Sequence, residues 1–306
     1  MVKAFGYRSN GTADVQELLE IDMPTPLAAD LLVQVRAAGV NPVDWKIRSG
    51  AYGATPPDSF PIVFGFEASG VVRAVGKDVE GFAVGDEVFG RAASGSGTWA
   101  EFTLLVADGT AHKPPHVSFN DAATLSIAGA TAYDGVTQLE LKPGQTLLIN
   151  GASAGVGVAA AQIARDLDIF VIGTASEAKR ALVESLGATF VAYGDGVADR
   201  VRELMPDGVD AILDLAGGDG LRAVAELVTD KTKLISAADP ATAAEVGGHG
   251  IVRDYDPRIL DVLAAMVADR KLDPHVEDAI PLDKAADAMA AVEGGHAKGK
   301  VVIEVA

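Results

Sequence analysis

The chain has 306 residues and no cysteine, and its 43 acidic and 25 basic side chains give a formal net charge of −18. The negative charge opposes binding to nucleic acids and to anionic membrane surfaces, and the lack of cysteine excludes disulfides, thiolate metal sites and a cysteine nucleophile. The hydrophobic content of 49% over this length indicates two substantial cores. Because we find no signal-peptide pattern and no apolar run of about 18 residues, we expect a cytoplasmic protein.

Residues 1–118 predict a compact domain of short, mostly antiparallel strands. Alternating or β-branched runs are separated there by clusters of Gly, Pro and Asp, which is typical of strands joined by turns. We predict these strands at residues 2–5, 15–20, 31–37, 68–75, 87–90 and 99–104.

After residue 119 the pattern changes to a long helix over residues 122–139 and then to strands and helices in alternation, which predicts a doubly wound parallel sheet. The fold class is therefore α/β, with a β-rich domain from residues 1–118 and 268–306 and a parallel-sheet domain from residues 119–267. We expect the C-terminal segment to pack back onto the first domain. The strands of the parallel sheet are predicted at residues 146–150, 169–173, 190–193, 209–214 and 233–236, the late helices at 257–269 and 282–293, and the last strand at 301–305.

The most informative stretch is residues 147–157 (LLINGASAGVG), followed by a run of small residues. A buried strand, a glycine-dense turn and a tightly packed helix form the first half of a dinucleotide site. Backbone N–H groups at a helix N-terminus can hold a pyrophosphate, and only small side chains let the phosphate approach them. The residues predicted to do so here are Gly151, Ser153, Ala154, Gly155, Val156 and Gly157.

Two other interpretations of this turn stay open. The same residues spell G-x-S-x-G around Ser153, which could be the nucleophile of a serine hydrolase, and Asp214 and His249 follow in the right chain order. The turn could also be an ordinary βα connection without a ligand. A P-loop is excluded because no lysine follows the glycines.

The end of the second parallel strand indicates which dinucleotide binds. Residues 173–176 (GTAS) contain no acid of the kind that holds the ribose hydroxyls of NAD. Ser176 can cap the next helix, and Lys179 and Arg180 lie in its first turn, where cations are unfavourable unless an anion is bound. This pattern favours the 2′-phosphate of NADPH. The alternative is a solvated helix face on which acidic neighbours balance the two cations.

Several motifs in order along the chain carry a family resemblance. The chain resembles the zinc-independent quinone oxidoreductase (zeta-crystallin-like) branch of the medium-chain dehydrogenase/reductase superfamily. This resemblance implies a GroES-like β-rich catalytic domain, a Rossmann domain that binds NADPH, and a homodimer paired near residues 251–252. The motifs are residues 39–50 (GVNPVDWKIRSG), 65–72 (GFEASGVV), 85–90 (GDEVFG), 130–133 (ATAY), the glycine turn, and 299–302 (GKVV).

Zinc-binding members of this superfamily carry a Cys and a His at the positions of Asn41 and Phe66. An amide and a phenyl ring cannot replace these ligands, so we expect no metal, and alcohol oxidation without a Lewis acid is disfavoured. What the resemblance implies instead is hydride transfer to a quinone or to the β-carbon of an α,β-unsaturated ketone or aldehyde.

Such an acceptor gains negative charge on its carbonyl oxygen, which needs a hydrogen-bond donor or a proton. Tyr52 and the amide of Asn41 are the candidate donors, and Asp44 is expected to fix their loop or to touch the nicotinamide ribose. Tyr52 could equally pack on the substrate as an aromatic lid. Catalysis could also be mostly positioning, in which case no single substitution abolishes it.

The resemblance implies further contacts to NADPH, in addition to Asn41 and the glycine turn. Besides Ser176 and Lys179, these come from Thr131 near the nicotinamide, Tyr193 near the adenosine phosphate, and Ala216, Ser236 and Ala237 after the fourth and fifth parallel strands. The alternative from a different class of function is a non-catalytic NADPH-binding protein, as in the recruitment of this branch as crystallins.

Overall fold

The computed structural model describes residues 1–295 and 297–305, and the chain forms two compact units. The first unit comprises Met1–Ile127, Tyr255–Ala268 and Val276–Ala306, and the second comprises Ala128–Asp254 and Asp269–His275. Within the described residues, no helix has the length and apolarity needed to cross a membrane.

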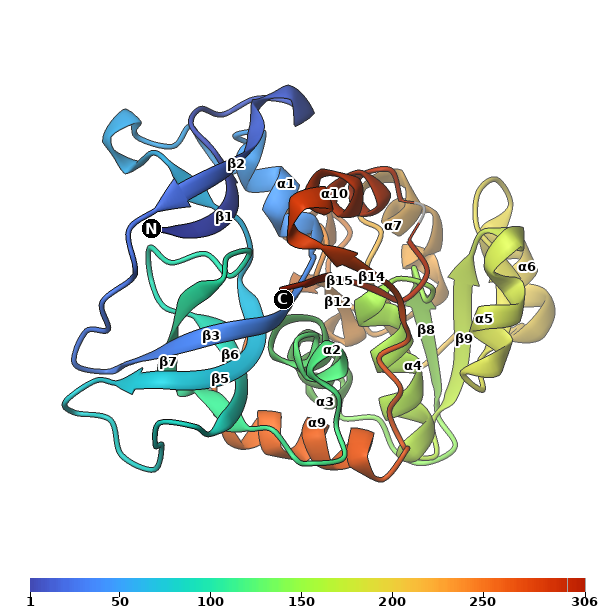
Figure 1. The fold of residues 1–306 in the computed structure, drawn as a ribbon. Helices are drawn as coiled ribbons and strands as arrows, with labels where there is room; N and C mark the ends of the chain where they lie inside the picture. The colour runs from blue at the N-terminus through green and yellow to red at the C-terminus, as the bar shows by residue number, and fades with distance from the viewer. Residues whose placement is uncertain (296, 306) are drawn as a thin grey trace. The chain divides into compact units, whose positions relative to one another are not determined.

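The first unit is built on a six-stranded sheet with the order β14-β15-β3-β5-β6-β7. A further pairing of β3 with β7 closes four of these strands into a small barrel, and β14 pairs in parallel with β15 (Figure 1). A three-stranded sheet with the order β2-β1-β4 completes the unit. The strands are β1 (Val2–Tyr7), β2 (Gln16–Ile21), β3 (Asp30–Gly39), β4 (Ile62–Val63), β5 (Glu67–Val75), β6 (Glu87–Ala92), β7 (Phe102–His112), β14 (Val276–Pro281) and β15 (Lys300–Glu304).

Strand residues that alternate between the two faces of the sheet make the core of this unit. In β3 the inward-facing side chains of Leu31, Val33 and Val35 are buried. The ring of Trp99 packs on Phe5 and Phe64, with centroid distances of 6.2 and 5.2 Å. Trp99 also donates from Nε1 to the carbonyl of Gly39 at 3.2 Å, which holds the ring at the end of β3.

The helices of the first unit are short and cover the strand ends. The helix α10 packs against α1, β14 and β15, and α9 packs against β7. They are α1 (Pro42–Arg48), α2 (Phe119–Ala122), α9 (Arg258–Ala268) and α10 (Ala285–Glu293), with the 3-10 turns η1 (Ala13–Val15), η2 (Pro57–Ser59) and η7 (Leu282–Lys284).

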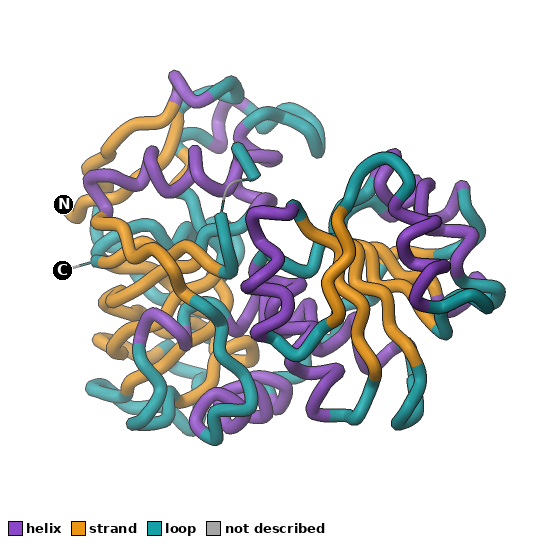
Figure 2. The backbone as a smooth tube through the Cα atoms, turned by 90° about the vertical axis from the view of Figure 1, so that its right-hand side faces the viewer, coloured by secondary structure: helices purple, strands orange, loops and turns teal. Residues whose placement is uncertain are grey.

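The second unit contains a six-stranded sheet in which all pairings are parallel, with the order β10-β9-β8-β11-β12-β13. The strand order reverses between β8 and β11, and ligands of such sheets bind at this point, outside the carboxyl ends of the strands. Figure 2 shows the twist of this sheet and the helices on both of its sides. The strands are β8 (Thr146–Asn150), β9 (Phe170–Ala175), β10 (Thr189–Ala192), β11 (Ala211–Asp214), β12 (Leu234–Ser236) and β13 (His249–Gly250).

Small side chains let the helices of this unit lie close to the sheet. Residues 157–164 of α4 are all buried, and α4 packs against β8, β9 and α3. The helices are α3 (Ala130–Gln138), α4 (Gly155–Asp166), α5 (Arg180–Ser185), α6 (Val197–Leu204), α7 (Gly218–Val224) and α8 (Pro240–Glu245), with the turns η4 (Glu177–Lys179), η5 (Ala225–Leu227) and η6 (Lys231–Lys233).

The predicted helix over residues 122–139 is interrupted in the structure. The chain forms α2, then a π-helix η3 (Leu125–Gly129), and only then α3. The backbone N–H of Ile127 donates to Glu67 Oε2 at 2.8 Å instead of to a helical carbonyl. A side chain that inserts into the backbone ladder is a known cause of such breaks. Periodicity along this segment could not reveal it because Glu67 lies far away in the sequence.

The strand predicted at residues 99–104 also differs, since β7 begins only at Phe102 and runs to His112. The two units differ from the expected domains in three places: residues 119–127 and 255–267 lie in the first unit, and residues 269–275 lie in the second. The hydroxyl of Ser69 donates to the carbonyl of Phe119 at 2.6 Å, and the guanidinium of Arg91 lies 5.2 Å from the ring centre of Tyr255. These contacts attach both segments to the β-rich unit.

Candidate active site

The predicted phosphate-binding turn lies between β8 and α4 in the second unit. Gly151 has a φ of +101°, which favours glycine, and it turns the chain directly after β8. A Cβ on Gly157 would lie 2.4 Å from the carbonyl oxygen of Gly151. The backbone of the turn therefore packs directly on the first turn of α4, and a side chain at position 157 has no room.

The N-terminus of α4 presents backbone donors without intrahelical partners. Its backbone ladder starts with the N–H of Val158, which donates to the carbonyl of Ala154 at 2.8 Å. The N–H groups of Gly155, Val156 and Gly157 precede this bond, so no bond within α4 uses them. Ala154 is exposed and Ser153 is buried. This arrangement of donors and small side chains fits a pyrophosphate.

A chain of hydrogen-bonded polar side chains connects the glycine turn to the ends of the neighbouring strands. Asn150 Nδ2 donates to Asp214 Oδ1 at 2.8 Å, and Thr174 Oγ1 donates to Asn150 Oδ1 at 2.8 Å. The hydroxyl of Thr174 in turn accepts from the N–H of Gly151 at 3.0 Å. The sequence analysis assigned Asn150 and Thr174 no role. Polar residues at the ends of three adjacent buried strands were the signal that could have identified this network.

Asp214 also organises the predicted residues after the fourth and fifth strands. Its carboxylate accepts from the N–H groups of Ala216 and Gly217 and from Ser236 Oγ, the last at 2.6 Å. The N–H of Ala237 donates to the backbone carbonyl of Asp214 at 2.9 Å. The structure thus brings Ala216, Ser236 and Ala237 together at the carboxyl ends of β11 and β12.

The residues predicted at the 2′-phosphate follow two adjacent strands. Ser176 and Tyr193 come directly after β9 and β10, and the N–H of Tyr193 donates to the carbonyl of Ala175 at 3.0 Å. The ring of Tyr193 is exposed. Ser176 occupies the N-cap position of η4, but its side chain makes no capping bond. Lys179 is the last residue of η4, three residues after Ser176.

Arg180 has acidic partners on its own segment. Its guanidinium pairs with Glu177 at 2.6 Å and with Glu184 at 3.5 Å, and it lies 4.1 Å from the ring centre of Phe190. These pairs hold the pKa of Glu177 below its usual value, with the Arg180 bond as the largest cause. Arg180 therefore fits the alternative of a balanced, solvated face.

Thr131 lies in the first turn of α3 and is held by a residue that the sequence analysis missed. Arg253 Nη1 donates to Thr131 Oγ1 at 2.7 Å, and Arg253 Nε pairs with Asp134 at 2.6 Å. Asp134 is buried, and this burial raises the pKa of its carboxyl. No pattern near residue 253 pointed to this role, because the pairing spans more than a hundred residues.

In the first unit, Asn41 and Asp44 lie at the N-terminus of α1. Asp44 Oδ2 accepts from the N–H of Asn41 at 2.8 Å, and Asp44 Oδ1 accepts from the N–H of Gly65 at 3.2 Å. Asp44 is buried, and its burial raises the pKa of its carboxyl to about 7. Both oxygens hold backbone donors, so the position of Asp44 is consistent with a residue that fixes the loop.

The side chain of Asn41 joins a buried cluster with Glu67 and Lys300. Asn41 Nδ2 donates to Glu67 Oε1 at 2.8 Å, and Lys300 Nζ donates to Asn41 Oδ1 and to Glu67 Oε1, each at 2.9 Å. Glu67 begins β5 and Lys300 begins β15. Both residues stand inside motifs noted in the sequence, and a charged residue at the start of a buried strand was the signal that could have identified them.

Tyr52 and Phe66 lie near this cluster in the chain but differ in exposure. The side chain of Tyr52 is 67% exposed, in the loop after α1, and Phe66 is half-buried directly before Glu67. Among the described residues, no group of three or more His, Asp and Glu side chains is arranged to hold a metal ion.

The arrangement required for a serine hydrolase is not assembled around Ser153. The two ring nitrogens of His249 lie against the backbone carbonyls of Gly250 and Thr232, at 3.0 and 3.2 Å. The carboxylate of Asp214 is held by Asn150, Ser236 and backbone donors, as described above. The geometry therefore does not support this alternative.

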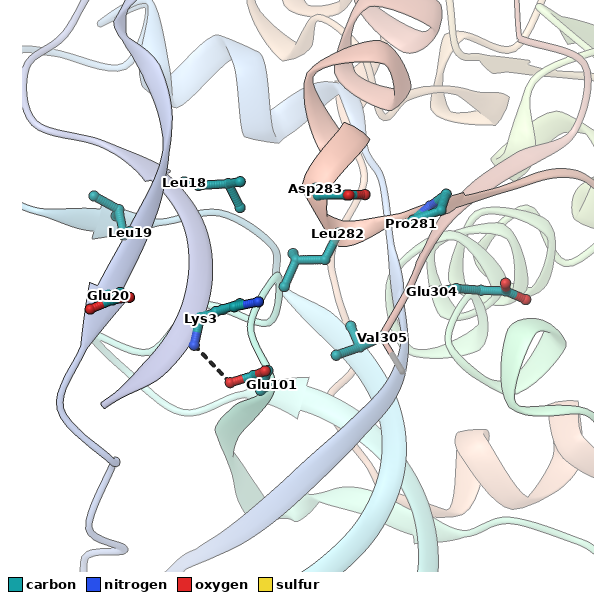
Figure 3. A pocket seen from close by; sticks show the side chains of 10 residues that line it. All are labelled: Lys3, Leu18, Leu19, Glu20, Glu101, Pro281, Leu282, Asp283, Glu304 and Val305. Atoms are coloured by element: carbon teal, nitrogen blue, oxygen red, sulfur yellow. Dashed lines mark hydrogen bonds between the residues drawn. The ribbon is translucent and has the colours of Figure 1, made fainter.

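A cavity of about 520 Å³ opens elsewhere on the first unit (Figure 3). Its apolar side chains come from β2, from Pro281 at the end of β14, from Leu282 of η7 and from Val305 directly after β15. Lys3 lies beside Glu101, whose carboxylate accepts from the backbone N–H of Lys3. None of the predicted site residues lines it. The lining residues are Lys3, Leu18, Leu19, Glu20, Glu101, Pro281, Leu282, Asp283, Glu304 and Val305.

Comparison with known proteins agrees with this geometry. Residues 28–115 match the family "Alcohol dehydrogenase GroES-like domain", and residues 186–303 match the family "Zinc-binding dehydrogenase". The chain is 33% identical to the 2-methylene-furan-3-one reductase of Solanum lycopersicum, over 99% of this chain and 79% of that protein. It is 31% identical to the chloroplastic NADPH-dependent alkenal/one oxidoreductase of Arabidopsis thaliana, with the same coverage.

Among solved structures, the quinone oxidoreductase of Coxiella burnetii superimposes with a TM-score of 0.91. It is 29% identical and covers 100% of this chain and 99% of its own. The two matched families together include residues of both units. The relative from Solanum lycopersicum and the structure from Coxiella burnetii match nearly the whole chain, including the glycine turn, Asn41 and Glu67. With Asn41 and Phe66 at the positions where zinc-binding relatives carry ligands, the chain belongs to the zinc-independent quinone oxidoreductase branch of the medium-chain dehydrogenase/reductase superfamily.

Proposed function

We propose that this protein transfers a hydride from NADPH to a quinone or to the β-carbon of an α,β-unsaturated ketone or aldehyde, without a metal ion. Its relatives include an enone reductase, an NADPH-dependent alkenal/one oxidoreductase and a quinone oxidoreductase. The observation that carries the proposal is the amide of Asn41, a hydrogen-bond donor at a position where zinc-binding relatives hold a metal ligand.

The second unit has the features that NADPH requires. When bound, the cofactor supplies the hydride. The open N–H groups of α4 suit its pyrophosphate, and the absence of an acid at the end of β9 leaves room for a 2′-phosphate beside Ser176, Lys179 and Tyr193. The remaining cofactor residues are Asn41, Thr131, Gly151, Ser153, Ala154, Ala216, Ser236 and Ala237.

The acceptor determines what the protein side chains must do. As an enone takes up a hydride at its β-carbon, a C–H bond forms there and the π electron pair moves onto the carbonyl oxygen. A donor that meets this oxygen lowers the barrier because it binds the charge that develops. We assign this role to Asn41, with Tyr52 as a second donor or a lid, while Asp44 fixes the loop. The α-carbon then takes its proton from Tyr52 or from water.

NADPH oxidation, followed by its near-ultraviolet absorbance, tests this proposal. The panel contains 1,4-quinones, non-quinone enones and enals, each measured with NADPH and with NADH. We expect turnover with NADPH on both acceptor classes. If only quinones react, the donor roles of Asn41 and Tyr52 are wrong. If NADPH binds and no acceptor reacts, the protein is the non-catalytic alternative.

We also propose a homodimer, and a cytoplasmic location. The strand β13 lies at the edge of the parallel sheet, which supports pairing with a second copy. Two residues after β13, the side chain of Gln138 forms hydrogen bonds with the backbone of Val252: its Nε2 donates to the carbonyl, and its Oε1 accepts from the N–H. A second copy must therefore pair at residues 249–250 or displace Gln138. The molar mass from light scattering during gel filtration tests the dimer, and a monomeric mass would exclude it.

A further inference from the structure

The buried cluster of Asn41, Glu67 and Lys300 satisfies its polar atoms almost completely. Lys300 Nζ has three N–H bonds, and it donates to the carbonyl of Val40 at 3.1 Å, to Asn41 Oδ1 and to Glu67 Oε1. Glu67 Oε1 accepts from Asn41 and Lys300, and Glu67 Oε2 accepts from the N–H of Ile127. The side chains of Lys300 and Glu67 are 3% and 0% exposed.

The space around the cluster is shaped for it. A Cβ on Gly39 would lie 2.2 Å from Glu67 Oε1 and 2.7 Å from the carbonyl oxygen of Ala123. Glycine at this position therefore lets the carboxylate approach the end of β3. The carboxylate cannot move toward Gly39, and the amide of Asn41 has fixed partners on two sides.

The two charged partners determine which way the amide of Asn41 faces. An ammonium group can only donate hydrogen bonds, and an ionised carboxylate can only accept them. Lys300 therefore selects the amide oxygen and Glu67 selects the amide nitrogen. A rotation by 180° about the side-chain bond would place N–H against N–H and oxygen against oxygen. The two charges therefore strongly oppose such a flip.

One polar hydrogen of the cluster is left over. The amide nitrogen of Asn41 carries two N–H bonds, and within the described residues only the bond to Glu67 uses one of them. Asn41 itself is buried, with 5% of its surface exposed. The second N–H is thus available to an acceptor from outside the cluster, and its direction follows from the two charges.

We propose that Lys300 and Glu67 are a positioning pair, which orients the amide of Asn41 so that its free N–H meets the carbonyl oxygen of the hydride acceptor. This inference rests on the proposed function and adds two residues to it. Neither charge touches the substrate in this mechanism. Reversing the pair reverses the amide, and then a lone pair of Oδ1 faces the oxygen that becomes negative.

The test exchanges the two charges in the double variant Glu67→Lys with Lys300→Glu. The net charge of the cluster is conserved and the preferred orientation of Asn41 is inverted. The exchange also removes the bonds to the N–H of Ile127 and to the carbonyl of Val40, so its effect is compared with that of the same exchange in a background without the Asn41 amide. We expect kcat on an enone to fall about 100-fold, as for the loss of an oxyanion donor. The NADPH dissociation constant should change less than about twofold. The neutral pair Glu67→Gln with Lys300→Met removes the orientation without buried charge, and we expect about a 10-fold fall in kcat.

The same variants in an Asn41→Ala background separate positioning from a structural role. Residues that act only through Asn41 lose their effect when its amide is absent, so neither pair should lower kcat further in that background. A further loss of similar size there would overturn the proposal. The control is Lys113→Met, which removes another buried lysine of the same unit, paired with Glu87 at 2.9 Å. It should leave kcat unchanged in both backgrounds.

A direct readout keeps this proposal separate from the proposed function. If the wild-type protein reduces no acceptor, the proposed function fails, while the side-chain amide resonances of Asn41 still report its orientation. We expect a nuclear Overhauser contact from one amide proton to the side chain at position 67 in the wild type, and in the charge-exchanged variant a contact to the side chain at position 300 instead. If both orientations are populated in the wild type, the positioning pair is wrong even when enones react.

Discussion

The glycine turn of the second unit and the Asn41 cluster of the first unit hold polar groups in opposite ways. The turn exposes backbone N–H groups at the start of α4, and its close packing depends on the absence of a side chain at Gly157. The cluster buries side chains and pairs nearly all their polar atoms. A backbone site offers the same donors whatever its neighbours are, whereas a side-chain site depends on every partner. The two regions should therefore respond differently to substitution.

The largest effect is expected where one partner of a buried ion pair is removed. Lys300→Met leaves the carboxylate of Glu67 buried without its cation, so we expect the free energy of unfolding to fall by about 3–5 kcal/mol. Urea denaturation measures this. Lys113→Met is the matched control, because its partner Glu87 is 48% exposed and can be hydrated. Equal losses for the two variants would contradict the burial argument.

A methyl group at Gly157 tests the second region, in which the backbone and not the side chains provides the donors. In Gly157→Ala the new Cβ meets backbone atoms of Gly151 and Ala152 that cannot move aside. We expect the free energy of unfolding to fall by about 1–3 kcal/mol and NADPH to bind at least about 10-fold more weakly. Gly220→Ala is the control, since its nearest contact, at 3.6 Å, is ordinary. It should match the wild type in NADPH affinity by fluorescence titration.

We propose that cofactor selectivity depends on Lys179, in the turn η4 that follows β9. Lys179→Ala removes a charge-assisted bond to the 2′-phosphate, so NADPH should bind about 10- to 100-fold more weakly while NADH binding hardly changes. The control is Arg180→Ala, whose guanidinium already pairs with Glu177 and Glu184. If Arg180→Ala changes the selectivity and Lys179→Ala does not, the assignment is reversed. Titrating both variants with NADPH and with NADH gives the dissociation constants that show which of the two cations sets the selectivity.

The last expected effect is the pH dependence that Asp44 contributes. Its pKa in the folded chain is raised to about 7, mainly by burial, so the folded state keeps a proton that the unfolded state has lost. The contribution of Asp44 to stability therefore decreases as the pH rises from about 4 to about 7 and is constant above that range. We therefore expect the free energy of unfolding of the wild type to fall as the pH rises across this window.

Asp44→Asn cannot ionise, so its free energy of unfolding should depend less steeply on pH than that of the wild type. Urea denaturation at about pH 5 and about pH 8 compares the two slopes. Asp283→Asn, in the wall of the cavity of Figure 3, is the control for the loss of one negative charge. Parallel pH profiles for Asp44→Asn and the wild type would show that burial does not protonate Asp44.

The order of elements followed from the sequence because it depends on local patterns. Alternating and β-branched residues predicted β1, β2, β3, β5 and β6 of the first unit but not β4 or β14, and the strand-turn-helix pattern predicted the glycine turn and α4. The helix over residues 122–139 was wrong in its middle, where Glu67 takes the N–H of Ile127. The sequence motifs also contained Glu67 and Lys300. They did not predict that these two side chains are in contact, because a contact between residues far apart in the chain produces no local sequence pattern.

By itself, therefore, the sequence determined the fold class, the family and the glycine turn between β8 and α4, because the residues that form them follow one another along the chain. Only the tertiary structure decided which side chains share a site. It paired Arg253 with Thr131, linked Asp214 through Asn150 to Thr174, and enclosed Asn41 between a buried ammonium and a buried carboxylate. The physical reason is that folding creates these pairs: each charge is stable in the interior only beside its partner, and the partners come from separate strands and helices.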